Sequence, residues 1–289
     1  MINRRAFIGG ASAVAGSYAL GPGGHVSAAH AHGPIDLENP RQLHTAHRKL
    51  VYTLDDANVY WYIDALRMGF RDGELTPMWN FHAGLVYRIT TLGEFRYRVD
   101  TVMKIYYTRL EDRATLLTTF DNPYTGKSHE VVQPRLFKTS SIFGLAGIEQ
   151  EKVADSPETT GRRYINEDIG PGKIVGDDVW INADMIRREE MPNRFGRLLQ
   201  VNDWMTFHGS LSDLADPGLA SAPATMNFND LNTWNSNWSG MVGTNSWSFS
   251  RGMGRKTDRV GGMPQNWRNF ISLDHPELLT DTPGFQDPS

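Results

Sequence analysis

Three histidines, His82, His129 and His208, are the side chains of this sequence best suited to proton transfer. An imidazole titrates near neutral pH, so each can act as a general acid or base. His82 follows Phe81 in an otherwise apolar run, where it must be either a hydrogen-bonded core residue or part of a wet cavity. The histidines predict cofactor-independent acid/base chemistry of the lyase or isomerase type.

His129 comes just after a segment whose residue types strongly favour a turn, Asp121-Asn122-Pro123-Tyr124-Thr125-Gly126-Lys127, which we call the corner. Proline presets φ and glycine accepts positive φ, so the corner is rigid and holds a side chain at low entropic cost. Tyr124 and Glu130 are near His129 in sequence, and an acid, a base and an orienting group could all come from this corner. The alternative is that His129 only hydrogen-bonds carbonyls of the turn.

Aromatic residues and methionine are the unusual feature of the composition, with 8 Trp, 10 Tyr, 13 Phe and 11 Met. Such side chains fill β cores and also line pockets for flat or apolar ligands. Residues 222–258 interleave tryptophan with asparagine, a composition that suits stacking on a sugar or an aromatic ring and also loops that close a barrel mouth. The expected ligand-binding residues are Trp79, Trp180, Trp204, Trp234, Trp238 and Asn202.

No transition-metal site and no cofactor are expected. The chain has no cysteine, and only His44 and His47 have ligand-like spacing, without a Glu-x-x-His motif or a second pair. A calcium or magnesium site built from loop carboxylates stays open. A nucleophile elbow, a dinucleotide fingerprint and a Walker loop are all missing from the sequence.

The charge pattern excludes several partners. The 29 basic and 33 acidic residues are well mixed along the chain, so the sequence has no cluster of basic residues that would bind nucleic acid. Beyond the N-terminus no apolar run reaches the length of a membrane span, so membrane insertion is not expected. The expected partner is a small apolar or aromatic molecule, and the sequence has no signal for an oligomeric state.

The N-terminus has the pattern of a twin-arginine export signal. Arg4-Arg5 precede a weakly apolar, Gly- and Ala-rich stretch, and small residues after Val26 could form the cleavage site. We expect residues 1–32 to be the signal peptide, residues 33–289 to form a single β-rich domain, and the mature protein to be periplasmic or secreted.

Alternating strands must position the candidate side chains. Residues 95–108 alternate with a period of two, which predicts a half-buried strand with one wet face. The runs 115–120 and 130–137 are expected to complete a three-stranded meander. Asp72-Gly73 predicts a hairpin turn. Residues 198–211 also alternate and predict a strand. Asp203 lies on its apolar side, whereas His208 lies on the other side with Trp204 and Asn202.

The expected fold is all-β and mainly antiparallel, either a curved sheet or a calycin-like barrel with an internal cavity and a short N-terminal helix. Asn39-Pro40 predict the start of that helix, within residues 36–53. A flattened β-sandwich is the alternative. The tail from Asn266 to Ser289 is expected to be irregular and to lie along the surface.

Residues 95–138 resemble the domain-of-unknown-function family DUF1838, a group of exported bacterial proteins. The resemblance rests on a strand ending in Tyr106-Tyr107, a short polar break, the 121–127 corner, and then His129-Glu130-Val131. It extends from about Leu54 to Pro283 and includes the Trp-rich tract and the late Met263-Pro264. The resemblance does not identify catalytic residues in this chain.

Three classes of function remain open. The first is an enzyme with its acid and base groups inside the barrel, the second a lipocalin-like binding protein for a hydrophobic ligand, and the third a carbohydrate-active protein that uses the Trp/Asn tract. Polar residues recur within the apolar alternating strands, a cost that binding alone seldom requires, and this favours the enzyme.

Overall fold

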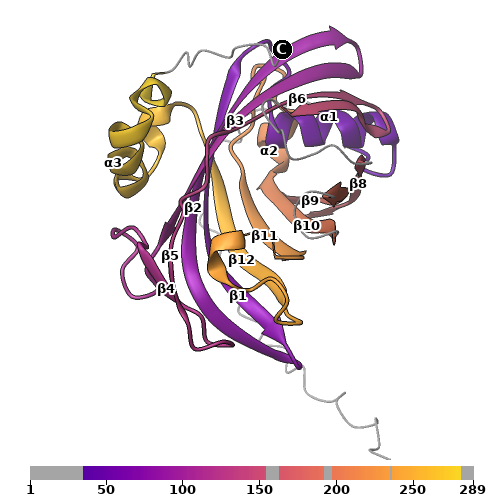
Figure 1. Ribbon diagram of the computed structural model, residues 1–289. Helices are drawn as coiled ribbons and strands as arrows, with labels where there is room; N and C mark the ends of the chain where they lie inside the picture. The colour runs from indigo at the N-terminus through magenta and orange to yellow at the C-terminus, as the bar shows by residue number, and fades with distance from the viewer. Residues whose placement is uncertain (1–34, 154–162, 192–196, 235, 281–289) are drawn as a thin grey trace, which may run out of the picture. The chain divides into compact units, whose positions relative to one another are not determined.

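A computed structural model describes residues 35–153, 163–191, 197–234 and 236–280; the predicted signal peptide lies outside these ranges. Within them, one antiparallel sheet of ten strands dominates (Figure 1). The strands are β1 (Asn58–Arg71), β2 (Glu74–Gly93), β3 (Arg96–Thr108), β6 (Phe137–Gly144), β7 (Gly147–Val153), β8 (Arg163–Val175), β9 (Asp178–Met191), β10 (Arg197–Ser210), β11 (Thr225–Asn232) and β12 (Trp247–Thr257). Their order in the sheet is β7-β6-β3-β2-β1-β12-β11-β10-β9-β8.

The sheet curves until its two edges meet. The edge strands β7 and β8 lie in contact, so the sheet is nearly closed into a barrel. This confirms the curved antiparallel sheet predicted from the strand patterns, and the alternative of two packed sheets is not what forms. The predicted hairpin also forms, because Asp72 and Gly73 both adopt the positive φ, 52° and 85°, that a two-residue turn between β1 and β2 requires.

Helix α1 (Pro40–Val51) begins where the sequence predicts. The Asn39 side chain accepts hydrogen bonds from the backbone N–H groups of Arg41 and Gln42, which caps the helix N-terminus. Its apolar face includes the fully buried Leu50 and packs against β8 and β10. Figure 1 shows α1 within the curve of the sheet.

A buried ammonium group satisfies the C-terminal end of α1. The Nζ atom of Lys256, on β12, lies 2.6 to 3.1 Å from four carbonyl oxygens, those of Lys49, Leu50, Tyr52 and Ala222, and shares its three N–H donors among them. The last carbonyls of a helix have no partners within the helix and carry partial negative charge. Lys256 supplies the missing donors, although burial, with a smaller contribution from Lys49, lowers the pKa of its amino group to about 7.

From Asp100 to Thr108 both faces of β3 are covered, so the expected wet face is wrong for this part of the strand. Lys104, Tyr106 and Thr108 belong to the side predicted to be wet, yet each is at most 4 % exposed. Helix α3 (Gln265–Asp274) and the short η4 (Pro276–Leu279) bury this outer side, with Trp267 lying against Gly84 of β2. The prediction of an irregular surface tail is therefore wrong for residues 266–279.

The predicted three-stranded meander is also wrong. β4 (Thr119–Asp121) and β5 (Ser128–Glu130) pair only with each other, and β6, not residues 130–137, pairs with β3. The turn between β4 and β5 is as predicted, since Asn122 Oδ1 accepts from the N–H of Tyr124 at 2.9 Å and Gly126 has a φ of 68°.

The remaining short helices are α2 (Leu211–Ala215), η2 (Asn237–Ser239) and η3 (Val260–Gly262). Among the described residues, no helix has the length and apolarity to cross a membrane.

Replacing Gly84 should loosen the packing of α3 on the sheet. A Cβ atom at Gly84 would lie 2.2 Å from Cζ2 of Trp267, so Gly84→Val should lower the free energy of unfolding by about 1–3 kcal/mol in chemical denaturation. Gly93→Val on the same strand is the matched control, because a Cβ atom there meets only Cβ of Arg96, at 3.9 Å. Equal losses in the two variants would contradict the role of this contact.

Candidate functional site

The inner face of the curved sheet lines a cavity of about 1140 Å³. Most of its wall comes from inward-facing apolar side chains at every second position of the strands. The principal ones are Trp61 and Ile63 on β1, Phe81 and Leu85 on β2, Met103 and Ile105 on β3, Met205 and Phe207 on β10, and Phe228 on β11. A cavity of this size and composition suits a small apolar ligand.

A row of polar side chains crosses the inner face. Arg67 on β1 is in register with Ser250 on β12, Ser250 with Asp230 on β11, and Asp230 with Asp203 on β10. Of these, Arg67, Asp230 and Asp203 line the cavity. We call these three residues the inner charged row.

Asp203 and Asp230 face each other across neighbouring strands. Directly opposed Cβ atoms in an antiparallel pair lie about 4.5–5.5 Å apart, close enough for the two carboxyl groups to repel each other when both are ionised. Burial, reinforced by the charge of Asp230, raises the pKa of Asp203 to about 7. Arg187 on β9 opposes that rise.

Arg67 distinguishes the two carboxyl groups. Its Nη1 atom lies 3.3 Å from both carboxylate oxygens of Asp230, whose side chain is 3 % exposed, and it also donates to Ser248 Oγ. Burial raises the pKa of Asp230 too, but the guanidinium opposes this. The guanidinium therefore favours the ionised form of Asp230, whereas Asp203, with a pKa of about 7, can bind and release a proton near neutral pH. Two carboxyl groups in unequal environments form an acid/base pair.

The sequence contains a signal for the inner charged row that the prediction missed. Each of the three residues occupies the apolar side of an alternating strand: Arg67 follows Ile63 and Ala65, Asp230 follows Met226 and Phe228, and Asp203 precedes Met205 and Phe207. The β1–β2 pairing also shifts register immediately after Arg67, and such irregularities often re-aim side chains at functional sites.

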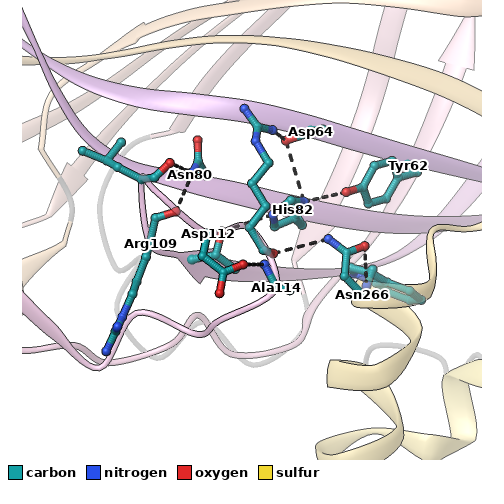
Figure 2. Close-up of polar contacts among 12 residues, drawn as sticks. Tyr62, Asp64, Asn80, His82, Arg109, Asp112, Ala114 and Asn266 are labelled. Carbon is teal, nitrogen blue, oxygen red and sulfur yellow. Dashed lines mark hydrogen bonds and ion pairs between the residues drawn. The ribbon is translucent and has the colours of Figure 1, made fainter.

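His82 lies on the outer face of the sheet, in the polar network of Figure 2. Its Nδ1 atom is 2.5 Å from the hydroxyl of Tyr62 and 3.7 Å from Oδ1 of Asp64, and its Nε2 atom is 3.1 Å from Thr108 Oγ1. The side chain is 1 % exposed, and burial lowers the pKa of His82. It is a buried histidine with both ring nitrogens satisfied, beside the loop 109–114.

The side chains of the rigid corner, and His129 after it, do not line the cavity in the described part of the chain. His129 on β5 packs toward the segment around η2, where a Cβ atom on Gly240 would lie 2.5 Å from His129 Nε2. The Tyr124 hydroxyl is buried without a hydrogen-bond partner among the described residues, and Glu130 is exposed.

The predicted ligand-binding residues form two groups. Trp79, Trp234 and Trp238 pack together, with the ring of Trp79 lying 5.8 Å from that of Trp234 and 5.2 Å from that of Trp238. This aromatic cluster adjoins the cavity wall, because Tyr107 contacts Trp79 and also lines the cavity. The second group, Trp180, Trp204 and Asn202, lies on β9 and β10.

His208 belongs to the outer face of β10. Its Nε2 atom lies 2.8 Å from Oδ1 of Asp178, its ring lies 4.9 Å from that of Trp180, and the nearby Trp204 is 40 % exposed. His82, His129 and His208 thus lie in three separate places. Within the described chain, none of the eleven predicted catalytic and ligand-binding side chains lines the cavity. Their chemical roles stay predictions.

Comparisons with known proteins add little. No family model matches the sequence, so the resemblance to DUF1838 stays a prediction. No curated protein matches it either. The crystal structure of a DUF1329 family protein from Desulfovibrio piger ATCC 29098 aligns with 84 % of this chain and 98 % of its own, at 7 % sequence identity and a TM-score of 0.24. That similarity supports no statement about function.

Asp203 should make the protein less stable as the pH rises. Its folded-state pKa of about 7 lies above the ordinary value of 3.8 for an aspartate, so the folded protein holds the extra proton between these values and loses stability as the pH rises through that window. Asp203→Asn should match the wild type near pH 4 and exceed it by about 1–4 kcal/mol at pH 8. Urea unfolding at both pH values measures this difference.

The exposed Asp121→Asn is the control, and it should leave the pH dependence unchanged. An Asp203→Asn variant whose stability parallels that of the wild type at all pH values would show that Asp203 titrates normally.

Proposed function

We propose that the protein is an enzyme that acts on a small apolar or aromatic molecule in the barrel cavity by general acid/base chemistry, of the lyase or isomerase type. The observation that supports this most is the pair Asp203 and Asp230, opposed across two strands and placed in unequal environments within an apolar cavity. The pair takes the role that the sequence had suggested for the histidines.

Asp203 is the proton carrier in this proposal. As a carboxylate it takes a proton from a substrate C–H group, and as a carboxylic acid it returns that proton to another carbon or to a leaving oxygen. A pKa of about 7 allows both halves of the cycle at neutral pH. Asp230 stays ionised because of Arg67 and keeps Asp203 basic, whereas the positive charges of Arg67 and Arg187 stabilise a developing oxyanion.

The second candidate is a lipocalin-like binding protein, which the volume and apolar wall of the cavity also support. This alternative requires no charged residues on the inner face. The carbohydrate alternative has less support, because Trp79 and Trp234 are 1 % and 8 % exposed and offer little ring surface to a sugar.

Deuterium exchange distinguishes the enzyme from the binding protein. A panel of apolar ketones is incubated with the protein in D2O, and deuterium uptake at carbon next to the carbonyl is followed by mass spectrometry. Asp203→Asn should slow the uptake by about 10²–10⁴-fold, because it removes the proton carrier. Binding of the neutral fluorophore N-phenyl-1-naphthylamine should stay within about twofold of the wild type, since the cavity keeps its shape.

Ile105→Trp is the companion variant, because it fills the cavity and should abolish fluorophore binding. Fluorophore binding without deuterium uptake in the wild type would support the binding protein. Uptake that is equally fast in Asp203→Asn would refute the role of Asp203.

We also propose that residues 1–32 direct twin-arginine export. Replacing both Arg4 and Arg5 with lysine should abolish the periplasmic or secreted protein and leave precursor in the cytoplasm, as immunoblots of cell fractions would show. Arg41→Lys, at an exposed position on α1, is the control. Undiminished export of the double variant would contradict the assignment.

A further inference from the structure

His47, on α1, lies at the cavity with both ring nitrogens unpaired. Its side chain is 1 % exposed and lines the cavity, and neither Nδ1 nor Nε2 has a hydrogen-bond partner among the described residues. The rings of Tyr52 and Phe207 contact it edge-on, at 6.2 and 5.8 Å. His47 therefore places an imidazole without hydrogen-bond partners in the described chain in an aromatic part of the wall.

Packing alone does not account for a histidine here. A buried polar group without a partner costs stability, and a leucine would fill the same position on the apolar face of α1 without that cost. Adjacent polar side chains on the helix are satisfied: the Arg48 guanidinium donates to the carbonyl of Thr53 at 2.8 Å and Lys49 Nζ to that of Leu214 at 2.9 Å. His44, three positions earlier and outside the cavity wall, leaves its Nε2 atom unpaired, but among the described residues of α1 only His47 leaves both ring nitrogens unpaired.

His47 is neutral at physiological pH. Burial, with a smaller contribution from His44, lowers the pKa of His47 to about 3. A neutral imidazole has one N–H donor and one acceptor nitrogen. It therefore matches a hydroxyl or a carbonyl oxygen and does not offer the charge that a carboxylate or phosphate would need.

We propose that His47 hydrogen-bonds a single neutral oxygen, a hydroxyl or carbonyl, at the α1 end of an otherwise apolar ligand. Phe207, which contacts His47, lies four positions from Asp203 on β10, or ~13 Å at the rise of a strand. This inference rests on the proposed function, and it defines the substrate class as an elongated fused-ring or long-chain alcohol or ketone. One oxygen lies at His47 and the reacting carbon at the inner charged row.

Three probes of nearly equal shape test the hydrogen bond. 4-Propylphenol can donate and accept, 4-propylanisole can only accept, and propylbenzene can do neither; each displaces N-phenyl-1-naphthylamine from the full-length protein. With the wild type, the phenol should displace the fluorophore at about a tenfold lower concentration than propylbenzene, with the anisole between them. In His47→Leu the three should become equal. The preference is a ratio within one protein, so a general loss of affinity cancels.

Two control variants should keep the preference. His44→Leu changes a buried histidine on the same helix that does not line the cavity, and Asp203→Asn changes the other polar part of the wall. His47→Met replaces the leucine variant if that variant does not fold.

Equal displacement by all three probes in the wild type, or a preference that survives in the His47 variant, would overturn the role of His47 while leaving the cavity as a binding site. Loss of the preference for the phenol in Asp203→Asn would show that the carboxyl pair, and not His47, hydrogen-bonds the ligand oxygen. Failure of the wild type to bind the fluorophore would remove both this inference and the proposed function.

Discussion

The part of the cavity wall that α1 provides depends on the hydrogen bonds of the Lys256 side chain. Helix α1 ends without a glycine cap, and its last carbonyls lie inside the protein, where each would cost about 1–3 kcal/mol if left without a donor. Lys256 reaches them from β12, and it also bonds the carbonyl of Ala222 before β11. One lysine side chain therefore joins the sheet to the helix that carries His47.

The inner charged row lowers the stability of the folded protein, and formation of the barrel does not require it. An alternating strand with a leucine at position 67, 203 or 230 would keep its pattern and gain apolar burial. The chain instead buries Asp230 against Arg67 and leaves Asp203 opposite a second carboxyl group, an arrangement that works against folding at neutral pH. Such local conflicts are expected where function has determined the residue.

Local patterns predicted much of the architecture, because hairpin turns, helix caps and strand alternation are properties of neighbouring residues. Asn39 and Asp72-Gly73 act within a few positions, and the structure has them as expected. The covered outer face of β3 was not predictable in this way, because Trp267 comes from far along the chain. The candidate site was not predicted for the same reason. Arg67 and Asp230 lie on β1 and β11, and their contact follows only from the strand order, in which β12 alone lies between these two strands.

The order of the strands also has a consequence for how the chain reaches its folded state. β1, the first strand, pairs with β12, the last, and the Arg67–Asp230 ion pair spans this junction between the two ends of the polypeptide. Closing so long a loop is entropically costly, and folds with such high contact order form slowly. During synthesis the N-terminal strands are complete long before their partner leaves the ribosome. The charged groups of the cavity are therefore assembled last, when nearly the whole chain has been made.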